Sequence, residues 1–287
     1  MIGRRRVLTI LAGSALAPRW ARAAEWQGHA LGAEARILIR GGDAPGALLA
    51  QVRAEIEAIE DVFSLYQESE LTRLNRNGQG MASAVMTDAL DLAWRVHRAT
   101  GGLFDPGVQV LWRQRAQGAA PVALRPFGGL RQQGRQLRLA SGQALTLNGI
   151  AQGIATDRVA ALLAGRGLGE VLVDMGEARA LDGEFRLELA DPQAGALGRL
   201  TLRAGRAVAT SSPAAMILAD GGAHIMGPQG QPPRWSTVSV EADSAALADA
   251  ASTAFVLMDR PQIARAARVL DLRAVRLVDF GGDLTTL

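Results

Sequence analysis

The chain contains no cysteine and, since all of its basic side chains are arginine, no lysine. Without cysteine it has no disulfide bond, no thiolate nucleophile and no lipid anchor on an N-terminal cysteine. Without lysine it has no Schiff-base amine and no compact ammonium charge for a phosphate group. Long apolar runs and internal repeats are also missing, so neither a membrane span nor a repeat architecture is indicated.

The first residues have the pattern of a targeting segment. Arginines 4, 5 and 6 precede an apolar stretch, residues 7–17, which leads to Ala-Arg-Ala at residues 21–23. This is typical of a secretory signal with a small-residue cleavage site. Paired arginines followed directly by hydrophobic residues favour the twin-arginine route for folded proteins. The alternatives are an ordinary secretory signal and a disordered basic start. We therefore expect residues 1–23 to be removed and residues 24–287 to act as one periplasmic domain.

The charge of the mature chain differs from that of the precursor. The whole sequence has a formal net charge of +3, but five of its 31 basic residues lie in the targeting segment, which has no acidic residue. The 26 basic residues that remain are outnumbered by 28 acidic ones. The mature protein is slightly acidic, so neither nucleic acid nor a membrane surface is indicated as a partner.

Hydrophobic periodicity predicts helices and strands that mix without strict alternation, which favours an α+β fold over a doubly wound sheet. A hairpin is expected around Ser141-Gly142. The predicted helices are residues 45–63, 87–100, 108–112, 152–165, 244–258 and 261–269, and the predicted strands are residues 29–40, 136–139, 144–147, 170–174, 185–189, 198–203, 207–210 and 236–240.

Two places have side chains or backbone groups suited to phosphate and Mg²⁺. Residues 148–153 (Asn-Gly-Ile-Ala-Gln-Gly) join a strand to a helix, where backbone N–H groups can hold a phosphate, although such turns are often only structural. Asp249 and Thr253 lie four residues apart in a helix, so a carboxylate and a hydroxyl share one face. Mg²⁺ prefers such oxygen ligands. The alternative is a solvated aspartate and a threonine that bonds back to its own helix.

His224 is one of three histidines, and it lies in a glycine-rich loop. It could act as an acid or a base, donate a hydrogen bond to a ligand, or be an ordinary loop residue. Residues 210–213 (Thr-Ser-Ser-Pro) provide hydroxyl groups after a strand. No histidine and carboxylate occur near them at the spacing of a serine hydrolase.

Six segments form a pattern over most of the chain. They are residues 63–66 (Phe-Ser-Leu-Tyr) with 69–71 and 74–75, residues 100–106 (Thr-Gly-Gly-Leu-Phe-Asp-Pro), residues 147–153 with 157–158, residues 171–176, His224-Ile225, and residues 248–250 with 253–254. Taken in this order they resemble the ApbE family of FAD:protein FMN transferases. The resemblance implies a two-lobed, T-fold-like α+β architecture, with mixed sheets and helices around a flavin cleft.

The resemblance also implies the site. Asp249, Thr253 and the backbone carbonyl of Gly149 would bind Mg²⁺, and His224 is our candidate for the general base. The residues implied to line the FAD site are Leu31, Tyr66, Leu103, Phe104, Asp105, Thr146, Gln152, His224 and Ile225.

The sequence departs from the family pattern in four places. Leu31 stands where methionine is usual, and Gln152 where lysine or an acidic residue is common. Gly176-Glu177 replaces a glycine pair, and Gly227 replaces the aspartate of the usual His-Ile-x-Asp-Pro pattern. These changes are expected to affect catalysis more than FAD binding.

The resemblance implies Mg²⁺-dependent transfer of FMN from FAD to a threonine or serine of an exported electron-transfer protein, with release of AMP. Two alternatives stay open at this point. One is a periplasmic protein that binds or delivers FAD without turnover, and the other is an Mg²⁺-dependent FAD pyrophosphatase with water as the acceptor.

Overall fold

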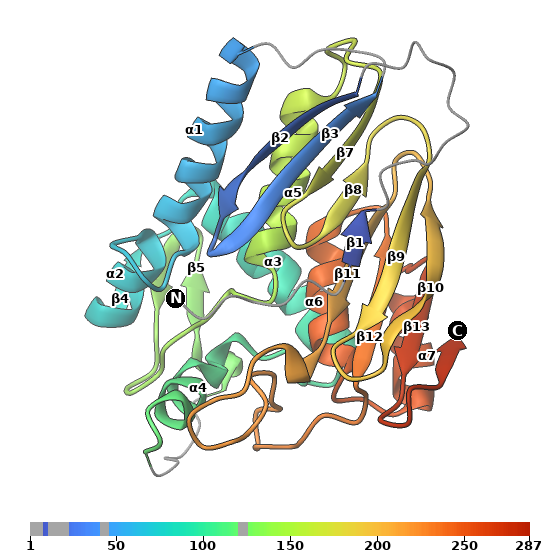
Figure 1. Ribbon diagram of the computed structural model, residues 1–287. Coiled ribbons are helices and arrows are strands. Elements are labelled where there is room, and N and C mark those ends of the chain that lie inside the picture. Colours follow the sequence, from blue (N-terminus) through green and yellow to red (C-terminus); the bar gives the residue numbers. More distant parts are fainter. Residues whose placement is uncertain (1–7, 11–22, 41–45, 120–125) are drawn as a thin grey trace.

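The computed structural model describes residues 8–10, 23–40, 46–119 and 126–287. Its centre is an eight-stranded sheet, in which all pairs of neighbouring strands are antiparallel (Figure 1). The expected α+β class is therefore confirmed. In order across the sheet the strands are β14 (Leu284–Thr286), β13 (Ala274–Val278), β12 (Thr237–Ala242), β11 (Ala207–Ser211), β8 (Ala178–Ala180), β7 (Glu170–Asp174), β3 (Ala33–Arg40) and β2 (Ala23–Ala30).

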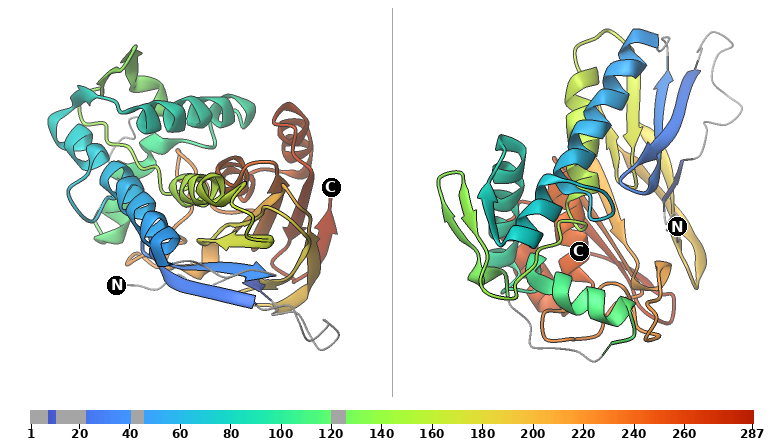
Figure 2. Two further views of the ribbon diagram at one scale, coloured as in Figure 1. Left: turned by 90° about the horizontal axis from the view of Figure 1, so that it is seen from above. Right: turned by 90° about the vertical axis from the view of Figure 1, so that its left-hand side faces the viewer.

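Helices cover one face of this sheet, as the view from above shows (Figure 2). They are α1 (Gly46–Phe63), α5 (Ala151–Leu163), α6 (Ala245–Phe255) and α7 (Arg260–Val269). The buried side chains of α1 recur every three or four residues, so one stripe of the helix faces the core. In α6 almost every side chain is buried, because this helix lies in the middle of the layer.

The opposite face packs against a smaller sheet. Strand β9 (Phe185–Asp191) pairs with β10 (Gly195–Leu202) on one side and with β1 (Leu8–Ile10) on the other. The alternate residues of β9 are buried, as expected of a strand with one face on the core. Strand β1 belongs to the expected signal peptide, whose removal stays a prediction. Removal of β1 would uncover one edge of β9. Strand β2 would be kept almost whole, because it begins at Ala23, where the expected signal peptide ends.

A third group of elements packs outside the helical layer (Figure 2). A three-stranded sheet in the order β4, β6 and β5 adjoins three helices. These strands are β4 (Gln79–Met81), β5 (Arg131–Gln133) and β6 (Gln136–Arg138), and the helices are α2 (Glu70–Asn77), α3 (Ala84–Ala99) and α4 (Gln109–Ala116). Short 3₁₀ turns precede α4 and β5 and follow β11, at Pro106–Val108, Phe127–Gly129 and Pro213–Ala215.

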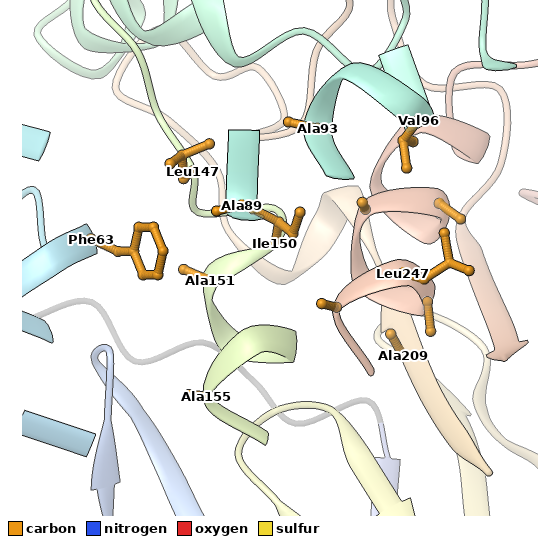
Figure 3. Close-up of a cluster of buried hydrophobic side chains, with 14 of the residues drawn as sticks. Phe63, Ala89, Ala93, Val96, Leu147, Ile150, Ala151, Ala155, Ala209 and Leu247 are labelled. Carbon is orange, nitrogen blue, oxygen red and sulfur yellow. The ribbon is translucent and has the colours of Figure 1, made fainter. Parts of the chain in front are cut away.

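The core lies between these layers. Figure 3 shows its centre, where Ile150 and Ala151 at the start of α5 lie among side chains of α1, α3 and α6, including Phe63, Ala89 and Leu247. Because the start of α5 is packed on these sides, its backbone is held in a fixed position.

Two strand predictions are wrong. Residues 29–40 form a hairpin rather than one strand, because Leu31 and Gly32 have positive φ angles of 50° and 78°, as a two-residue turn between antiparallel strands requires. Residues 144–147 form no strand, because the side chain of Asn75 hydrogen-bonds both the N–H and the carbonyl of Leu145. Strand β6 pairs instead with β5 and β4.

The predicted long helices are confirmed as α1, α3, α5, α6 and α7, with ends that differ by up to three residues. Helix α4 extends to Ala116, four residues beyond its predicted end. No helix among the described residues is long and apolar enough to cross a membrane.

Candidate functional site

The site is built where α5 and α6 approach each other most closely. Gly153 makes this approach possible, because a Cβ atom there would lie 2.5 Å from the carbonyl oxygen of Ala245 and from the Cα of Ala246. With no side chain between them, the two backbones touch. The first turn of α5 is therefore fixed against α6.

Each helix supplies a carboxylate to the start of the other. Asp157 on α5 accepts hydrogen bonds from the N–H groups of Ala245 and Ala246 and from the Ser244 hydroxyl. Asp249 on α6 accepts the N–H of Gly153 at 3.3 Å. The N-terminal residue of α5 makes no side-chain capping bond, so Asp249 takes the place of a local cap.

Gly149 lies two residues before α5, so its carbonyl is outside the hydrogen-bond ladder of that helix. Gly153 is the third residue of α5, so its N–H is one of the first four of the helix, which have no acceptor within it. Here it donates to Asp249, and within the described chain the Gly149 carbonyl accepts no hydrogen bond. A carbonyl oxygen without a hydrogen-bond partner among the described residues is therefore available at the start of the helix that Asp249 caps.

Thr253 completes the group of oxygens. A Cβ atom on Gly149 would lie 3.0 Å from the Thr253 hydroxyl oxygen, so this hydroxyl lies against the Gly149 backbone. It is 3.4 Å from the Ser211 hydroxyl, and the carbonyl of Asp249 is bonded by Ser252 instead. Asp249 is only 4% exposed. The alternative of a solvated aspartate and a threonine bonded to its own helix therefore does not fit Asp249 and Thr253.

A small pocket of about 60 Å³ opens in front of these oxygens, and Gly149 and Thr253 line it. Five residues that the family resemblance implies for the FAD site also line this pocket, and they come from other segments of the chain. They are Leu103, Phe104, Asp105, Thr146 and Ile225. Segments far apart in the sequence are brought together here by the N–H of Thr146, which donates to the carbonyl of Pro106 at 2.8 Å.

Asp105 is the charged side chain of this pocket among the described residues. One of its carboxylate oxygens accepts the N–H groups of Gly107 at 2.7 Å and Phe127 at 2.9 Å. Burial raises the pKa of the Asp105 carboxyl, and these hydrogen bonds oppose the shift only in part. The carboxyl therefore carries its charge at a cost, which a bound cation or a ligand N–H would reduce.

A larger cavity of about 500 Å³ adjoins the small pocket, and the two share Leu103 and Leu257. Its other lining residues are Gln231, Pro232, Pro233, Arg234 and Gln262. The small pocket can hold only a few atoms, whereas the larger cavity has the volume of a typical small-molecule site, roughly 300–1,000 Å³.

Four residues implied for the FAD site do not line either cavity. Leu31 lies in the hairpin turn, where its N–H donates to Glu60. Tyr66 is 79% exposed after the end of α1. Gln152 is buried, and its amide approaches the carbonyl of Met175 at 3.4 Å. Their contact with FAD stays a prediction, as does that of His224.

His224 lies beside the pocket, next to the two pocket residues Ile225 and Met226. Its Nδ1 is 3.1 Å from the carbonyl oxygen of Pro213 and 3.2 Å from that of Met216. Since carbonyl oxygens only accept hydrogen bonds, Nδ1 must carry the proton. In the neutral ring Nε2 then carries the lone pair, as a general base requires.

Sequence analysis missed several residues of the site. Met226, Pro106, Val108 and Leu257 line the small pocket. Leu257 follows Thr253 by four residues, so helical spacing could have indicated it. Gly153 and Ser211 lie in segments that the sequence indicated, but their contacts with α6 join distant parts of the chain and have no local signal in the sequence.

The oxygen atoms at the start of α5 fit a metal ion of the hard, oxygen-binding kind. Within the described ranges, no three histidine, cysteine, aspartate or glutamate side chains cluster as a metal site. One carboxylate, one hydroxyl and one carbonyl instead lie around the start of α5. Such a set suits Mg²⁺, which takes oxygen ligands and usually keeps water or substrate phosphates in its remaining positions.

Comparison with known proteins gives a consistent result. The model of the ApbE family matches residues 31–276. No curated protein sequence matches the chain significantly.

Several solved structures share its fold, among them three ApbE proteins. Flavin transferase ApbE from Vibrio cholerae is 21% identical, with a TM-score of 0.78 over 93% of this chain and 97% of that one. The apo form of the flavinyl transferase ApbE from Pseudomonas stutzeri is 23% identical, with a TM-score of 0.78 over 93% and 94%. The ApbE protein from Thermotoga maritima is 22% identical, with a TM-score of 0.80 over 92% and 96%.

Proposed function

This chain belongs to the ApbE family, and we propose that it is an Mg²⁺-dependent FAD:protein FMN transferase that modifies a threonine or serine of another protein. The names of its structural neighbours, flavin transferase and flavinyl transferase, agree with this activity. AMP is the second product.

One observation carries the proposal most directly. The carbonyl of Gly149, the carboxylate of Asp249 and the hydroxyl of Thr253 lie together at the start of α5, and two of these residues line the small pocket. A helix N-terminus favours negatively charged groups because its N–H groups and dipole point toward them. A metal ion at these oxygens and a diphosphate at this end of α5 would stabilise each other.

When bound, Mg²⁺ would neutralise charge on the diphosphate and make the phosphorus more electrophilic. The chain's own residues would orient the reactants. The target hydroxyl oxygen forms a bond with the FMN phosphorus, and the bond from that phosphorus to the oxygen shared with AMP breaks. The hydroxyl proton goes to a base, for which Nε2 of His224 is our candidate.

His224 is well placed to be held in one orientation. The carbonyls of Pro213 and Met216 both face Nδ1, so they fix the ring and its tautomer. Pro213 follows Ser211 by two residues, and the Ser211 hydroxyl contacts Thr253. The end of β11 thus connects the metal-binding helix to the histidine loop.

Two family departures have a local structural account. At Gly227 a Cβ atom would lie 2.1 Å from the side-chain oxygen of Gln231, so an aspartate there would require this side chain to move. At Gly176, which has a φ of 103°, a Cβ atom would lie 3.0 Å from the amide nitrogen of Gln152. Gln152 therefore packs against this turn, directly before Glu177.

We further propose that the protein works in the periplasm after twin-arginine export, and that its acceptor is an exported electron-transfer protein. The basis is the arginine-rich, apolar segment before residue 24.

Chromatography of FAD, FMN and AMP tests the proposal against its two alternatives. The purified mature chain is incubated with FAD and Mg²⁺, with and without exported proteins encoded beside it. AMP without free FMN, formed only when the acceptor is present, supports the transferase. Free FMN in equal amount to AMP without any acceptor would indicate a pyrophosphatase, and retained, unchanged FAD would indicate a binding protein.

A further inference from the structure

The 500 Å³ cavity has the size needed for the part of a dinucleotide that the small pocket cannot hold. Since the two hollows share Leu103 and Leu257, a ligand whose phosphates lie beside Thr253 can continue into the larger one. Thr253 is in the last turn of α6, and Leu257 follows only two residues after the end of that helix. The group in the cavity would therefore be attached closely to the phosphates.

Positive charge is scarce around this path. Among the described residues that line either cavity, Asp105 is the anion and Arg234 is the cation. A diphosphate brings further negative charge, of which a single Mg²⁺ neutralises a part. Arg234 is thus the side chain that can meet the remaining charge, and its planar guanidinium matches two phosphate oxygens at once.

The backbone of Arg234 is held by the residues directly after α6, the helix that carries two of the proposed metal ligands. Its N–H donates to the carbonyl of Val256 at 2.7 Å, and the indole N–H of Trp235 donates to the carbonyl of Met258 at 2.8 Å. Val256 lies three residues after Thr253. The root of the arginine side chain therefore keeps a constant distance from the proposed metal site.

The Arg234 side chain is exposed, and among the described residues its guanidinium has no hydrogen-bond or ion-pair partner. The side-chain oxygen of Gln262 accepts the N–H of Asp259, which leaves the amide N–H groups of Gln262 as donors. Gln262 lines the same cavity, so these groups are a second candidate donor for a ligand there. Two donors of this kind without a structural partner suit an anionic ligand.

We propose that Arg234, assisted by the Gln262 amide, binds the adenylate half of FAD in this cavity and stabilises the charge that collects on the departing AMP phosphate. The inference rests on the proposed function. When the bond between the FMN phosphorus and the bridging oxygen breaks, its electron pair stays on the AMP phosphate. A fixed cation is most effective where charge increases during the reaction, which is on this leaving group and not on the FMN phosphate.

The test compares Arg234→Gln with Arg268→Gln. Arg268 is an exposed arginine on α7 that lines neither cavity, so its replacement removes the same charge without touching the proposed site. Binding of AMP and of FMN is measured by calorimetry in the presence of Mg²⁺, and thermal unfolding confirms that both variants are folded. Arg234→Gln should weaken AMP binding about tenfold or more and leave FMN binding within about twofold. Arg268→Gln should change neither.

The inference is wrong if AMP binds the two variants equally, if FMN binding falls in place of AMP binding, or if the wild-type chain binds no AMP. Failure of the proposed function has a different signature, because a chain without transferase activity can still bind AMP through Arg234. Arg234→Lys keeps the charge but not the planar fork, and it should bind AMP with an affinity between those of the wild type and the glutamine variant.

Discussion

The backbone N–H of Gly153 donates to the carboxylate of Asp249, 3.3 Å away on the neighbouring helix. The carbonyl of Gly149, which precedes α5, accepts no hydrogen bond among the described residues. One hydrogen bond between two helices thus caps α5 close to a backbone oxygen that remains available for a metal ion. The close contact at Gly153 and the packed start of α5 keep this arrangement rigid.

Substitution of Asp249 separates its role as the cap of α5 from its proposed role as a ligand of Mg²⁺. Asp249→Asn keeps an oxygen that accepts the Gly153 N–H, so its free energy of unfolding should stay within about 1 kcal/mol of the wild type. Asp249→Ala removes the cap and should cost about 1 kcal/mol. Both should lower Mg²⁺-dependent FAD turnover by at least about 10²-fold, measured as AMP release. Undiminished turnover in Asp249→Asn would rule out this carboxylate as a metal ligand.

Gly153 should be sensitive to the smallest enlargement. In Gly153→Ala the new methyl group would meet the backbone of Ala245 and Ala246, so the helices must separate. We expect a loss of about 1–3 kcal/mol in urea unfolding, with weaker Mg²⁺ binding. Gly46→Ala is the control, because nothing lies within 4 Å of its added Cβ. A Gly153→Ala protein as stable as the control would contradict the close helix contact.

Replacement of His224 tests the candidate base. His224→Ala should slow transfer by about 10²- to 10⁴-fold, the usual effect of a positioned base, and change FAD affinity little. His29→Ala, an exposed histidine on β2, provides the matched control. If His224→Ala stays within a few-fold of the wild type in single-turnover transfer, another group or water accepts the proton.

The buried Asp105 carboxyl should make stability depend on pH. Its raised pKa means that the folded state binds this proton more tightly than the unfolded chain does. The wild type therefore loses stability as pH rises from the ordinary carboxyl pKa of 3.8 through the raised one. Asp105→Asn does not titrate and keeps an oxygen for the Gly107 and Phe127 N–H groups.

The melting temperature of Asp105→Asn relative to the wild type should therefore be higher at about pH 7 than at about pH 4, in buffer without metal or flavin. A difference that is the same at both pH values, or larger in acid, would show that burial does not control this carboxyl.

The sequence predicted the long helices because their apolar residues recur at helical spacing, as in α1 and α6. It failed where a distant side chain replaces a backbone partner. Residues 144–147 alternate like a strand, but Asn75 bonds both polar groups of Leu145. The pairing of Gly153 with Asp249 is of the same kind, since the two are 96 residues apart.

In the candidate site, too, residues in short local motifs were predicted, and residues placed by contacts between distant segments were not. The resemblance to a family indicated Asp249, Thr253, Gly149 and the pocket residues from Leu103 to Asp105, all of which belong to short recognisable segments. Arg234 and Leu257 were not indicated, because their place beside the pocket depends on how the chain after β11 folds back onto the end of α6.

Intact-mass spectrometry of an acceptor protein tests the central claim most directly. The mature chain is incubated with FAD, Mg²⁺ and exported electron-transfer proteins encoded beside it, with EDTA and the Asp249→Asn variant as parallel controls. The account predicts a gain of one FMN on a threonine or serine of the acceptor, with an equal amount of AMP, and no gain in either control. A gain that persists in EDTA and with Asp249→Asn would contradict the metal site, and release of free FMN with no modified protein would contradict the transferase.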